Sequence, residues 1–326
     1  MAENYGLPYT GSKSRIAHWV IDHLPRGRVL IDAFAGGCAI THRALLSQKW
    51  QTIIANDINV KYPQLFIDAI HGRYRDERRW ISREDFERLK TQDAFVACCW
   101  SFGNNLIRYM YSPAIEPYKR ALHYAIVFND FEPMQELMPE IAQAVHEAIH
   151  WQRNLHDRRV MAQNVIVKTL KRLTGDNYAH QIIQSNPLYQ SIRHSNKDAQ
   201  SLERLQSLES LERLERLQSL ESLERLESLR VTSLSYDEID IPADAVVYCD
   251  PPYHACNGSL YEGNACFDHN AFYDWCVRVS KTNPIFISEY SIEDDRFEIV
   301  AEKQKLTRLS SVKAFNVTER LYTVKH

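Results

Sequence analysis

The residues with the clearest chemical potential are the acid, two prolines and tyrosine at positions 250–253, which directly follow the apolar run 246–249. Proline holds φ at about −65°, so the carboxylate of Asp250 and a backbone carbonyl of the segment Pro251–Pro252 would be fixed as two hydrogen-bond acceptors. Two such acceptors can bind one exocyclic amino group and favour the tetrahedral geometry that makes its nitrogen nucleophilic. The ring of Tyr253 would offer a flat face for stacking on a base. The competing interpretation is an acid followed by a proline-stiffened turn.

Two glycines occupy a turn that could also bind a ligand. In the sequence DAFAGGCAI, Gly36 and Gly37 follow an apolar run that ends on Asp32. Glycine at such a turn lets a ligand approach the backbone, which fits dinucleotide enzymes, methyltransferases or a plain tight turn. The G-x-G-x-x-G spacing of a dinucleotide site is incomplete here. One apolar run later, Asp57 could accept hydrogen bonds from both hydroxyl groups of a ribose, or it could cap the next helix.

Positive charge is concentrated in the segment 151–175, although the whole chain has a net charge of −3. The charged residues of this segment are Arg153, Asp157, Arg158, Arg159, Lys168, Lys171 and Arg172, a local charge of +5. A solvated helix face and a phosphate-facing surface both fit this pattern. The charge therefore leaves both interpretations open.

The composition, 44% hydrophobic and 25% charged over 326 residues, is typical of a soluble globular protein. The seven cysteines include no C-x-x-C pair, so we expect reduced, buried thiols and neither a zinc site nor a disulfide framework. No apolar signal core begins the chain, and no run of 18 apolar residues occurs. We expect a cytoplasmic protein without a membrane span.

The spacing of apolar residues predicts an α/β region at both ends of the chain. The expected helices are 16–24, 35–46 and 267–281, the expected strands are 28–34, 51–59, 246–249 and 283–291, and an antiparallel pair is expected over 305–325. We assign 1–60 and 231–326 to one catalytic domain. Residues 61–200 have longer polar helices and few strand signals, which predicts a separate helical domain.

Residues 201–229 form a leucine triplet repeat, in which leucine recurs at every third position. On an α-helix a three-residue step covers about 300°, so the leucine row drifts around the axis and closes a circle in about six triplets. One flat partner cannot cover such a row, which argues against a coiled coil. We expect 201–230 to be a helical insertion without catalytic residues, with a leucine-rich turn or strand as the competing shape.

Taken together, these motifs identify a family resemblance. The chain resembles the Dam-type DNA adenine-N6 methyltransferases, the α-ordered amino-methyltransferase group, which includes bacteriophage members. The resemblance rests on PYTGSKSRIA (8–17), DAFAGGCAITHRA (32–44), IIANDIN (53–59), SFGNNLIRY (101–109) and YCDPPY (248–253). It implies an α/β, Rossmann-like S-adenosylmethionine-dependent methyltransferase fold, a mixed sheet with helices on both faces, plus a mainly helical target-recognition insertion.

The resemblance also implies roles for particular residues. Catalysis would involve Asp250, Pro251, Pro252 and Tyr253. S-adenosylmethionine would be bound by Tyr9, Lys13, Asp32, Phe34, Gly36, Gly37, Asp57, Ile58, Tyr236, Asp250 and Tyr261. Lys13 would lie near the methionine carboxylate of this cofactor, and Tyr236 would pack on its adenine.

The stretch 101–109 resembles the hairpin with which the family reads DNA. The implied DNA-binding residues are Asn104, Asn105, Leu106, Arg108, Lys119 and Arg120. Asparagine and arginine can pair with base edges, and Leu106 would be either a wedge in the duplex or a core residue. The family often has N-G-L-x-R-Y-N, whereas this chain has N-N-L-I-R-Y-M. The recognised DNA sequence is therefore not carried over.

The implied reaction is direct methyl transfer from S-adenosylmethionine to N6 of an adenine flipped out of double-stranded DNA, without a metal. We expect a standalone monomer or weak dimer in a bacterial or phage-infected cell, either phage-encoded or partnered with a restriction enzyme. Alternatives are an N4-cytosine methyltransferase, which more often carries serine in place of Asp250, an RNA target and a catalytically silent DNA-binding homologue. A nicotinamide oxidoreductase is disfavoured by the incomplete glycine pattern.

Overall fold

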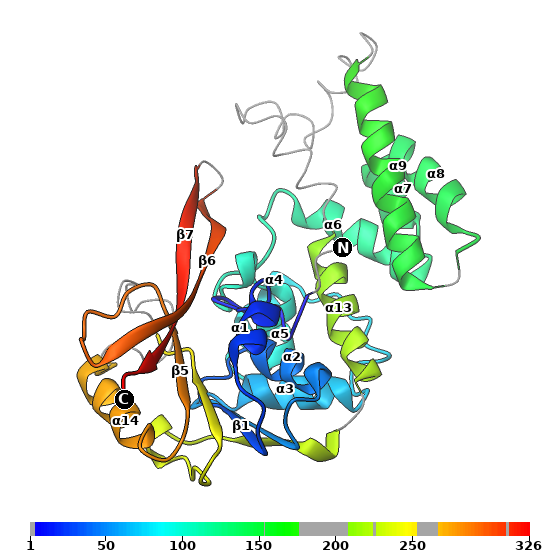
Figure 1. Cartoon of the computed structure of the whole chain (residues 1–326). Helices are drawn as coiled ribbons and strands as arrows, with labels where there is room; N and C mark the ends of the chain where they lie inside the picture. Colours follow the sequence, from blue (N-terminus) through cyan, green and yellow to red (C-terminus); the bar gives the residue numbers. More distant parts are fainter. Residues whose placement is uncertain (1–3, 153, 176–207, 224–225, 253–266, 311–312) are drawn as a thin grey trace. The chain divides into compact units, whose positions relative to one another are not determined.

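The computed structural model describes residues 4–152, 154–175, 208–223, 226–252, 267–310 and 313–326. They divide into two compact units, unit 1 (Met1–Arg75 and Leu217–His326) and unit 2 (Asp76–Arg216), shown in Figure 1. Tyr253 and Tyr261, two of the expected site residues, lie outside the described residues. Both ends of the chain thus contribute to unit 1.

Unit 1 contains a seven-stranded sheet in the order β3-β2-β1-β4-β5-β7-β6. Its strands are β1 (Val29–Asp32), β2 (Thr52–Asn56), β3 (Leu229–Thr232), β4 (Val246–Cys249), β5 (Ile285–Glu289), β6 (Phe297–Ser310) and β7 (Lys313–Val324). Strands β1 to β5 are parallel, and β7 runs antiparallel to both β5 and β6. The mixed α/β sheet of an S-adenosylmethionine-dependent methyltransferase fold is confirmed.

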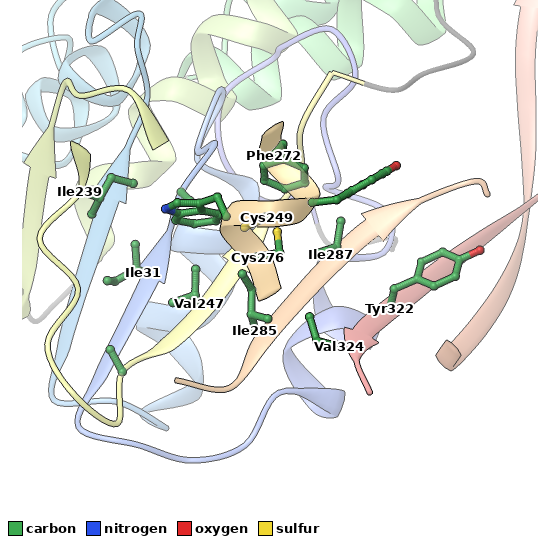
Figure 2. Packing of buried hydrophobic residues seen from close by; sticks show 14 of the residues in the cluster. Ile31, Ile239, Val247, Cys249, Phe272, Cys276, Ile285, Ile287, Tyr322 and Val324 are labelled. Carbon is green, nitrogen blue, oxygen red and sulfur yellow. The ribbon is translucent and has the colours of Figure 1, made fainter. Parts of the chain in front are cut away.

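Helices cover both faces of this sheet. On one face, α14 (His269–Val279) packs Phe272 and Cys276 against residues of β1, β4, β5 and β7 (Figure 2). On the other face, α2 (Ala39–Ser47) is anchored to β1 and packs beside α1 (Ala17–His23). Strands β1 and β4 are buried along their whole length, and apart from Asp32 at the end of β1 their residues are apolar, as expected of central parallel strands.

The order of the strands places a topological switch point between β1 and β4. From β1 the sheet continues through β2 and β3 on one side, and from β4 it continues through β5 on the other. In open α/β sheets, ligands bind outside the carboxyl ends of the strands at such a point. Asp32, Asp57 and Asp250 end or directly follow β1, β2 and β4, so the predicted acids lie at this edge.

The closing strands are longer than predicted. The expected antiparallel pair began at residue 305, whereas β6 begins at Phe297 and pairs there with Val324 of β7. Only residues 320–322 of β7 pair with β5, so β6 and β7 continue beyond the sheet as a two-stranded ribbon (Figure 1). The sequence does not predict the first residues of β6, because charged residues interrupt the alternation of apolar residues there.

The leucine triplet repeat is helical only in part. Helix α13 (Glu209–Ser219) is followed by the 3-10 turns η3 (Leu220–Ser222) and η4 (Leu226–Ser228), and the last leucine of the repeat begins β3. Turn η3 packs against α3 (Lys61–Ile70), and the described leucines from 208 to 223 are buried. The chain passes from unit 2 to unit 1 within α13, so the repeat belongs to both units.

Unit 2 is mainly helical. Its helices are α4 (Arg83–Leu89), α5 (Ala94–Trp100), η1 (Phe102–Asn104), α6 (Glu116–His123), the π-turn η2 (Tyr124–Phe128), α7 (Glu132–Leu137), α8 (Pro139–Ile149) and α9 (Leu155–Gly175). Its core combines residues of α6 to α9 with Leu208 and Leu211 of the leucine repeat. We assigned 1–60 and 231–326 to the catalytic domain, whereas unit 1 extends to Arg75 and begins again at Leu217. The added residues include α3 and η3, which pack together.

The described cysteines and helices do not discriminate between the candidate functions. The described cysteines, which are Cys38, Cys98, Cys99, Cys249 and Cys276, are all buried and free of disulfides. Burial raises the pKa of Cys98, Cys99 and Cys249 above the ordinary value, which keeps these thiols protonated. Among the described helices, none has the length and apolarity that a membrane crossing requires.

Candidate active site

The N-terminal segment packs directly on the glycine turn that follows β1. The backbone N–H of Leu7 donates to the carbonyl of Gly37 at 2.7 Å. A Cβ atom added at Gly37 would lie 2.5 Å from the Cβ of Tyr9, and one at Gly36 would lie 3.1 Å from the Tyr9 ring. Gly36 also has a φ of +46°, which glycine adopts without strain. The glycines are therefore required by the close approach of Tyr9, and these three predicted residues lie together.

Asp57 braces the glycine turn from the neighbouring strand. Its Oδ2 accepts the backbone N–H of Gly36 at 2.7 Å, and its Oδ1 accepts that of Asn59 at 2.8 Å. Burial raises the pKa of Asp57, and these two N–H groups partly oppose the shift. A carboxylate has about four lone-pair sites, so acceptor capacity remains. Asp57 does not cap the next helix, because Val60 is the N-cap residue of α3.

Asn56 is a positioning residue that the sequence analysis missed. Its amide donates to the carbonyls of Ala33 and Leu234 at 3.1 and 3.0 Å. Its oxygen accepts from the Thr232 hydroxyl at 2.8 Å and from the Leu234 N–H at 3.0 Å. One buried side chain thus ties together the ends of β1, β2 and β3. The only signal in the sequence was its place beside Asp57.

An aromatic group lies beside the glycine turn. The rings of Phe34 and Tyr236 are 5.8 Å apart at 30°, and Phe272 contacts both edge-on, at 5.7 and 5.3 Å. Phe34 and Tyr236 are both half-buried. Next to Asp57, Ile58 is 77% exposed, which is unusual for a large apolar residue. The structure therefore brings Phe34 and Tyr236 together and leaves Ile58 open to solvent.

Asp250 is held by a buried lysine. The ammonium of Lys13 lies 2.7 Å from Asp250 Oδ1 and 3.6 Å from Glu319 Oε1. Burial alone would lower the pKa of Lys13, but the charges of Asp250 and Glu319 outweigh it and raise the pKa above the ordinary value. Lys13 is therefore a cation. The resemblance implies a place for Lys13 near the cofactor, and the structure adds an ion pair with Asp250 that the sequence does not predict.

Asp32 is an internal anchor. Its side chain is 1% exposed, and its Oδ2 accepts the hydroxyl of Thr41 at 2.7 Å and the Thr41 backbone N–H at 3.2 Å. These bonds fix the first turns of α2 to the end of β1. Asp32, which we expected to contact the cofactor, has a buried carboxyl with almost no exposed surface, and its bonds to Thr41 position the glycine turn.

In unit 2, the stretch expected to read DNA closes as a small hairpin. Ser101 and Tyr109 form an isolated antiparallel bridge, and the N–H of Phe102 donates to the Arg108 carbonyl at 2.7 Å. Asn105 Oδ1 accepts the N–H groups of Ile107 and Arg108, both at 2.9 Å. The oxygen of Asn105 therefore shapes the turn, and the Arg108 side chain is exposed.

The tip of this hairpin is strained and partly apolar. Asn104 and Leu106 both have left-handed φ values, of 60° and 64°. Such a conformation costs roughly 1–2 kcal/mol for a residue other than glycine. Asn104 Oδ1 is buried without a hydrogen-bond partner among the described residues. Leu106 is half-buried, whereas Phe102 and Ile107, which the sequence analysis did not select, are exposed.

The basic residues of unit 2 divide into buried and exposed groups. Lys119, which we expected to bind DNA, is 2% exposed, and burial lowers its pKa to about 7, so little of its side chain is accessible. Arg120 is exposed, with its guanidinium 5.4 Å from the Tyr124 ring centre. Arg158 donates to the carbonyls of Ala125 and Ile126 in η2, and Arg159 pairs with Glu215 at 2.7 Å. Part of the positive charge of residues 151–175 is therefore engaged by carbonyl and carboxylate groups of the protein itself.

The comparisons with known proteins found one family match. Residues 9–124 match the family model of the D12 class N6 adenine-specific DNA methyltransferases. Over these residues the chain is similar to this class. No match was found among curated proteins. The matched residues include the N-terminal segment, the glycine turn, Asp57 and the 101–109 hairpin, whereas Asp250 lies beyond them.

The match decides between several of the alternatives. The class methylates N6 of adenine in DNA, which disfavours the N4-cytosine enzyme and the nicotinamide oxidoreductase. Within the part of the methyltransferase that the structure describes, no group of three or more metal-ligating side chains is gathered. The acids at the carboxyl edge of the sheet instead pair with a lysine, a threonine and backbone N–H groups.

We predict that Asp32 makes the stability of the methyltransferase fall as the pH rises from about 4 to 7. Burial raises its pKa to about 7, against the Thr41 hydrogen bond and with help from the charges of Asp250 and Asp57. The unfolded chain, with a pKa of about 3.9, ionises first, so the native state binds the extra proton in this window. Asp32→Asn removes this contribution.

The measurement is urea unfolding of both proteins from pH 4 to 8. The free energy of unfolding of Asp32→Asn should rise relative to wild type across the window, by on the order of 4 kcal/mol. Comparing the two proteins at each pH cancels the contribution of the other carboxyl groups to the free energy of unfolding, because both proteins contain them. A difference that does not change with pH would contradict the raised pKa of Asp32.

Proposed function

We propose that the chain transfers the methyl group of S-adenosylmethionine to N6 of an adenine flipped out of a short target sequence in double-stranded DNA. The observation that carries the proposal is the Lys13–Asp250 ion pair, which holds a carboxylate at the switch-point edge of the sheet, beside the family-matched glycine turn. When bound, S-adenosylmethionine supplies an activated methyl group on a sulfonium centre. The protein has to position the amine.

Asp250 is suited to bind that amine. Its side chain is 19% exposed, while Lys13 is 7% exposed, so the lysine approaches from the interior and leaves part of the carboxylate open. Pro251 and Pro252 fix the following backbone, which directs a carbonyl toward the same nitrogen. Two acceptors on one amine favour the tetrahedral nitrogen of the transition state. The amine becomes acidic only after methylation, so its proton can leave late, without a strong base.

The residues at the glycine turn fit S-adenosylmethionine. The turn leaves no room for a Cβ atom at Gly37 and presents backbone where a ligand can approach. Asp57 retains acceptor capacity for ribose hydroxyls, and the exposed Ile58 gives an apolar surface that an adenine ring could cover. The half-buried Phe34 and Tyr236 offer aromatic faces in the same unit. We assign the cofactor to this region.

The 101–109 hairpin is assigned to DNA recognition. The exposed Arg108 can pair with a guanine edge, and the half-buried Asn104 lies at the tip of the same hairpin. Phe102 and Ile107 give exposed apolar surface of the kind that separates stacked bases. Flipping costs a few kcal/mol, which stacking and hydrogen bonds to the extruded base must offset.

We predict that Asp250→Asn lowers the rate of methyl transfer by about 100-fold or more, because the amide removes one charged acceptor from the target amine. Binding of S-adenosylmethionine should change by only a few-fold. The measurement is transfer of tritium from labelled S-adenosylmethionine to unmethylated DNA, followed by separation of the nucleosides. Binding is measured separately by calorimetry.

The same assay separates the alternatives. Label in N6-methyl-2′-deoxyadenosine supports the proposal, and label in N4-methyl-2′-deoxycytidine would replace it with the cytosine reaction. Wild-type protein that binds DNA but transfers no label would identify a silent homologue. Sequencing of modified bases in a host that expresses the gene gives the target motif.

We predict that Gly37→Ala weakens binding of S-adenosylmethionine at least about tenfold, or roughly 1.4 kcal/mol. The added methyl would lie 2.5 Å from the Tyr9 Cβ, so the N-terminal segment must move away from the turn. Calorimetric titration measures the affinity. Ser47→Ala, at the other end of α2, should bind normally, and unchanged affinity in Gly37→Ala would remove the cofactor from this turn.

We predict that Arg108→Ala relaxes the target sequence without abolishing turnover. One lost base contact is worth roughly 1–3 kcal/mol of discrimination, so sites that differ at one base pair should gain methylation about tenfold relative to the true site. Modified-base sequencing measures this ratio. Arg88→Ala, at an exposed arginine of α4, is the matched control, and equal patterns in both variants would contradict the assignment.

A further inference from the structure

Glu319 is a fully buried carboxyl that the proposed reaction does not use. It lies on β7 with 0% exposure, and its Oε1 is 3.6 Å from the Lys13 ammonium. A buried charge is costly unless it is paired, so a carboxylate at this position must be explained by what it faces. It faces the same cation that binds Asp250.

The strand register explains why Glu319 points toward the site. Side chains alternate along β7, and Tyr322 and Val324 belong to the same buried cluster as Phe272 and Cys276 of α14 (Figure 2). Glu319 and Leu321 therefore point to the opposite face. On β4, Cys249 packs toward α14, so Tyr248 and Asp250 point to that opposite face as well. Glu319, Asp250 and the buried Lys13 meet on one side of the sheet.

We infer that Glu319 is a positioning residue for methyl transfer: it holds the Lys13 ammonium from the interior side, so that Lys13 presents Asp250 in one orientation to the target amine. The inference deepens the proposed function and rests on it. Lys13 has three donor hydrogens, and a lysine held by a single carboxylate can rotate with it. A second carboxylate fixes the ammonium between two points.

Other polar groups surround this triad. Tyr290, which follows β5, faces Lys13, and Tyr248 of β4 is influenced by both Asp250 and Glu319. The Tyr248 hydroxyl is 2.8 Å from the Ser288 hydroxyl of β5. Asp32 of β1 adds a carboxyl next to Asp250. Among the groups that influence Lys13, Glu319 and Asp250 are the two carboxylates, which makes Glu319 the second counter-ion.

The test is a double-mutant cycle on Lys13 and Glu319, using the full chain and target DNA. Glu319→Gln, which keeps the shape and removes the charge, should lower kcat about tenfold and leave the KM for S-adenosylmethionine within about twofold. Glu319→Asp, which keeps the charge, should retain more activity than Glu319→Gln. In a Lys13→Met background, Glu319→Gln should cause no further loss, because its effect passes through Lys13.

Glu302→Gln is the matched control, because Glu302 lies on the neighbouring strand β6 and pairs at 2.6 Å with Arg320. It should leave kcat unchanged. Unfolding of every variant is followed by circular dichroism, and Glu319→Asp carries the comparison where Glu319→Gln does not fold.

The outcomes separate the inference from the proposed function. Two results would overturn the positioning role: losses of kcat that multiply in the double variant, or a kcat of Glu319→Asp no higher than that of Glu319→Gln. The proposed function would still hold in either case if the wild-type protein transfers methyl groups. A fall in stability with normal kcat would make Glu319 purely structural. Absence of methyl transfer by the wild-type protein would instead overturn the proposed function.

Discussion

The site depends on one buried cation. The buried ammonium of Lys13 has a desolvation cost that would make it neutral if it were alone. The negative charges of Asp250 and Glu319 more than offset this cost. The ion pair joins residues from near the two ends of the chain, because Lys13 precedes the first helix whereas Asp250 follows β4 and Glu319 lies on β7. Electrostatic neutralisation thus fixes the N-terminal segment onto the sheet edge where the acids gather.

Close backbone packing provides the second constraint. The N-terminal segment can reach the sheet edge only because Gly37 leaves space for Tyr9 and because Asp57 and Asn56 hold the turn. The bonds of Asp57 and Asn56 pair the N–H of Gly36 and the carbonyl of Ala33 after β1. A turn that is held in this way before a ligand arrives loses less entropy when it binds one.

Much of this arrangement could be predicted from the sequence. Apolar runs that end on acids gave β1, β2 and β4, because central parallel strands are buried on both faces and only their ends are free for polar groups. Glu319 could not be found this way, since its partners lie on other strands and strand order is not written in local patterns. The burial of Lys119 was missed for a related reason: a lysine in a polar stretch is expected to be exposed, and only tertiary packing shows that it is buried.

The leucine triplet repeat shows how a local pattern can be identified correctly while its purpose is missed. A row that drifts around a helix cannot face one flat surface, but Leu208 and Leu211 join the core of unit 2, and the later leucines continue into unit 1. On the same helix, Arg213 donates to the carbonyl of Ser101 at 2.5 Å, and Ser210 accepts from the Tyr111 hydroxyl at 2.9 Å. These contacts hold the base of the 101–109 hairpin. A segment without catalytic residues therefore fixes the loop to which we assign DNA recognition. Because the leucine row turns around the axis of α13, the polar residues between the leucines can contact the hairpin while the leucines pack in the cores.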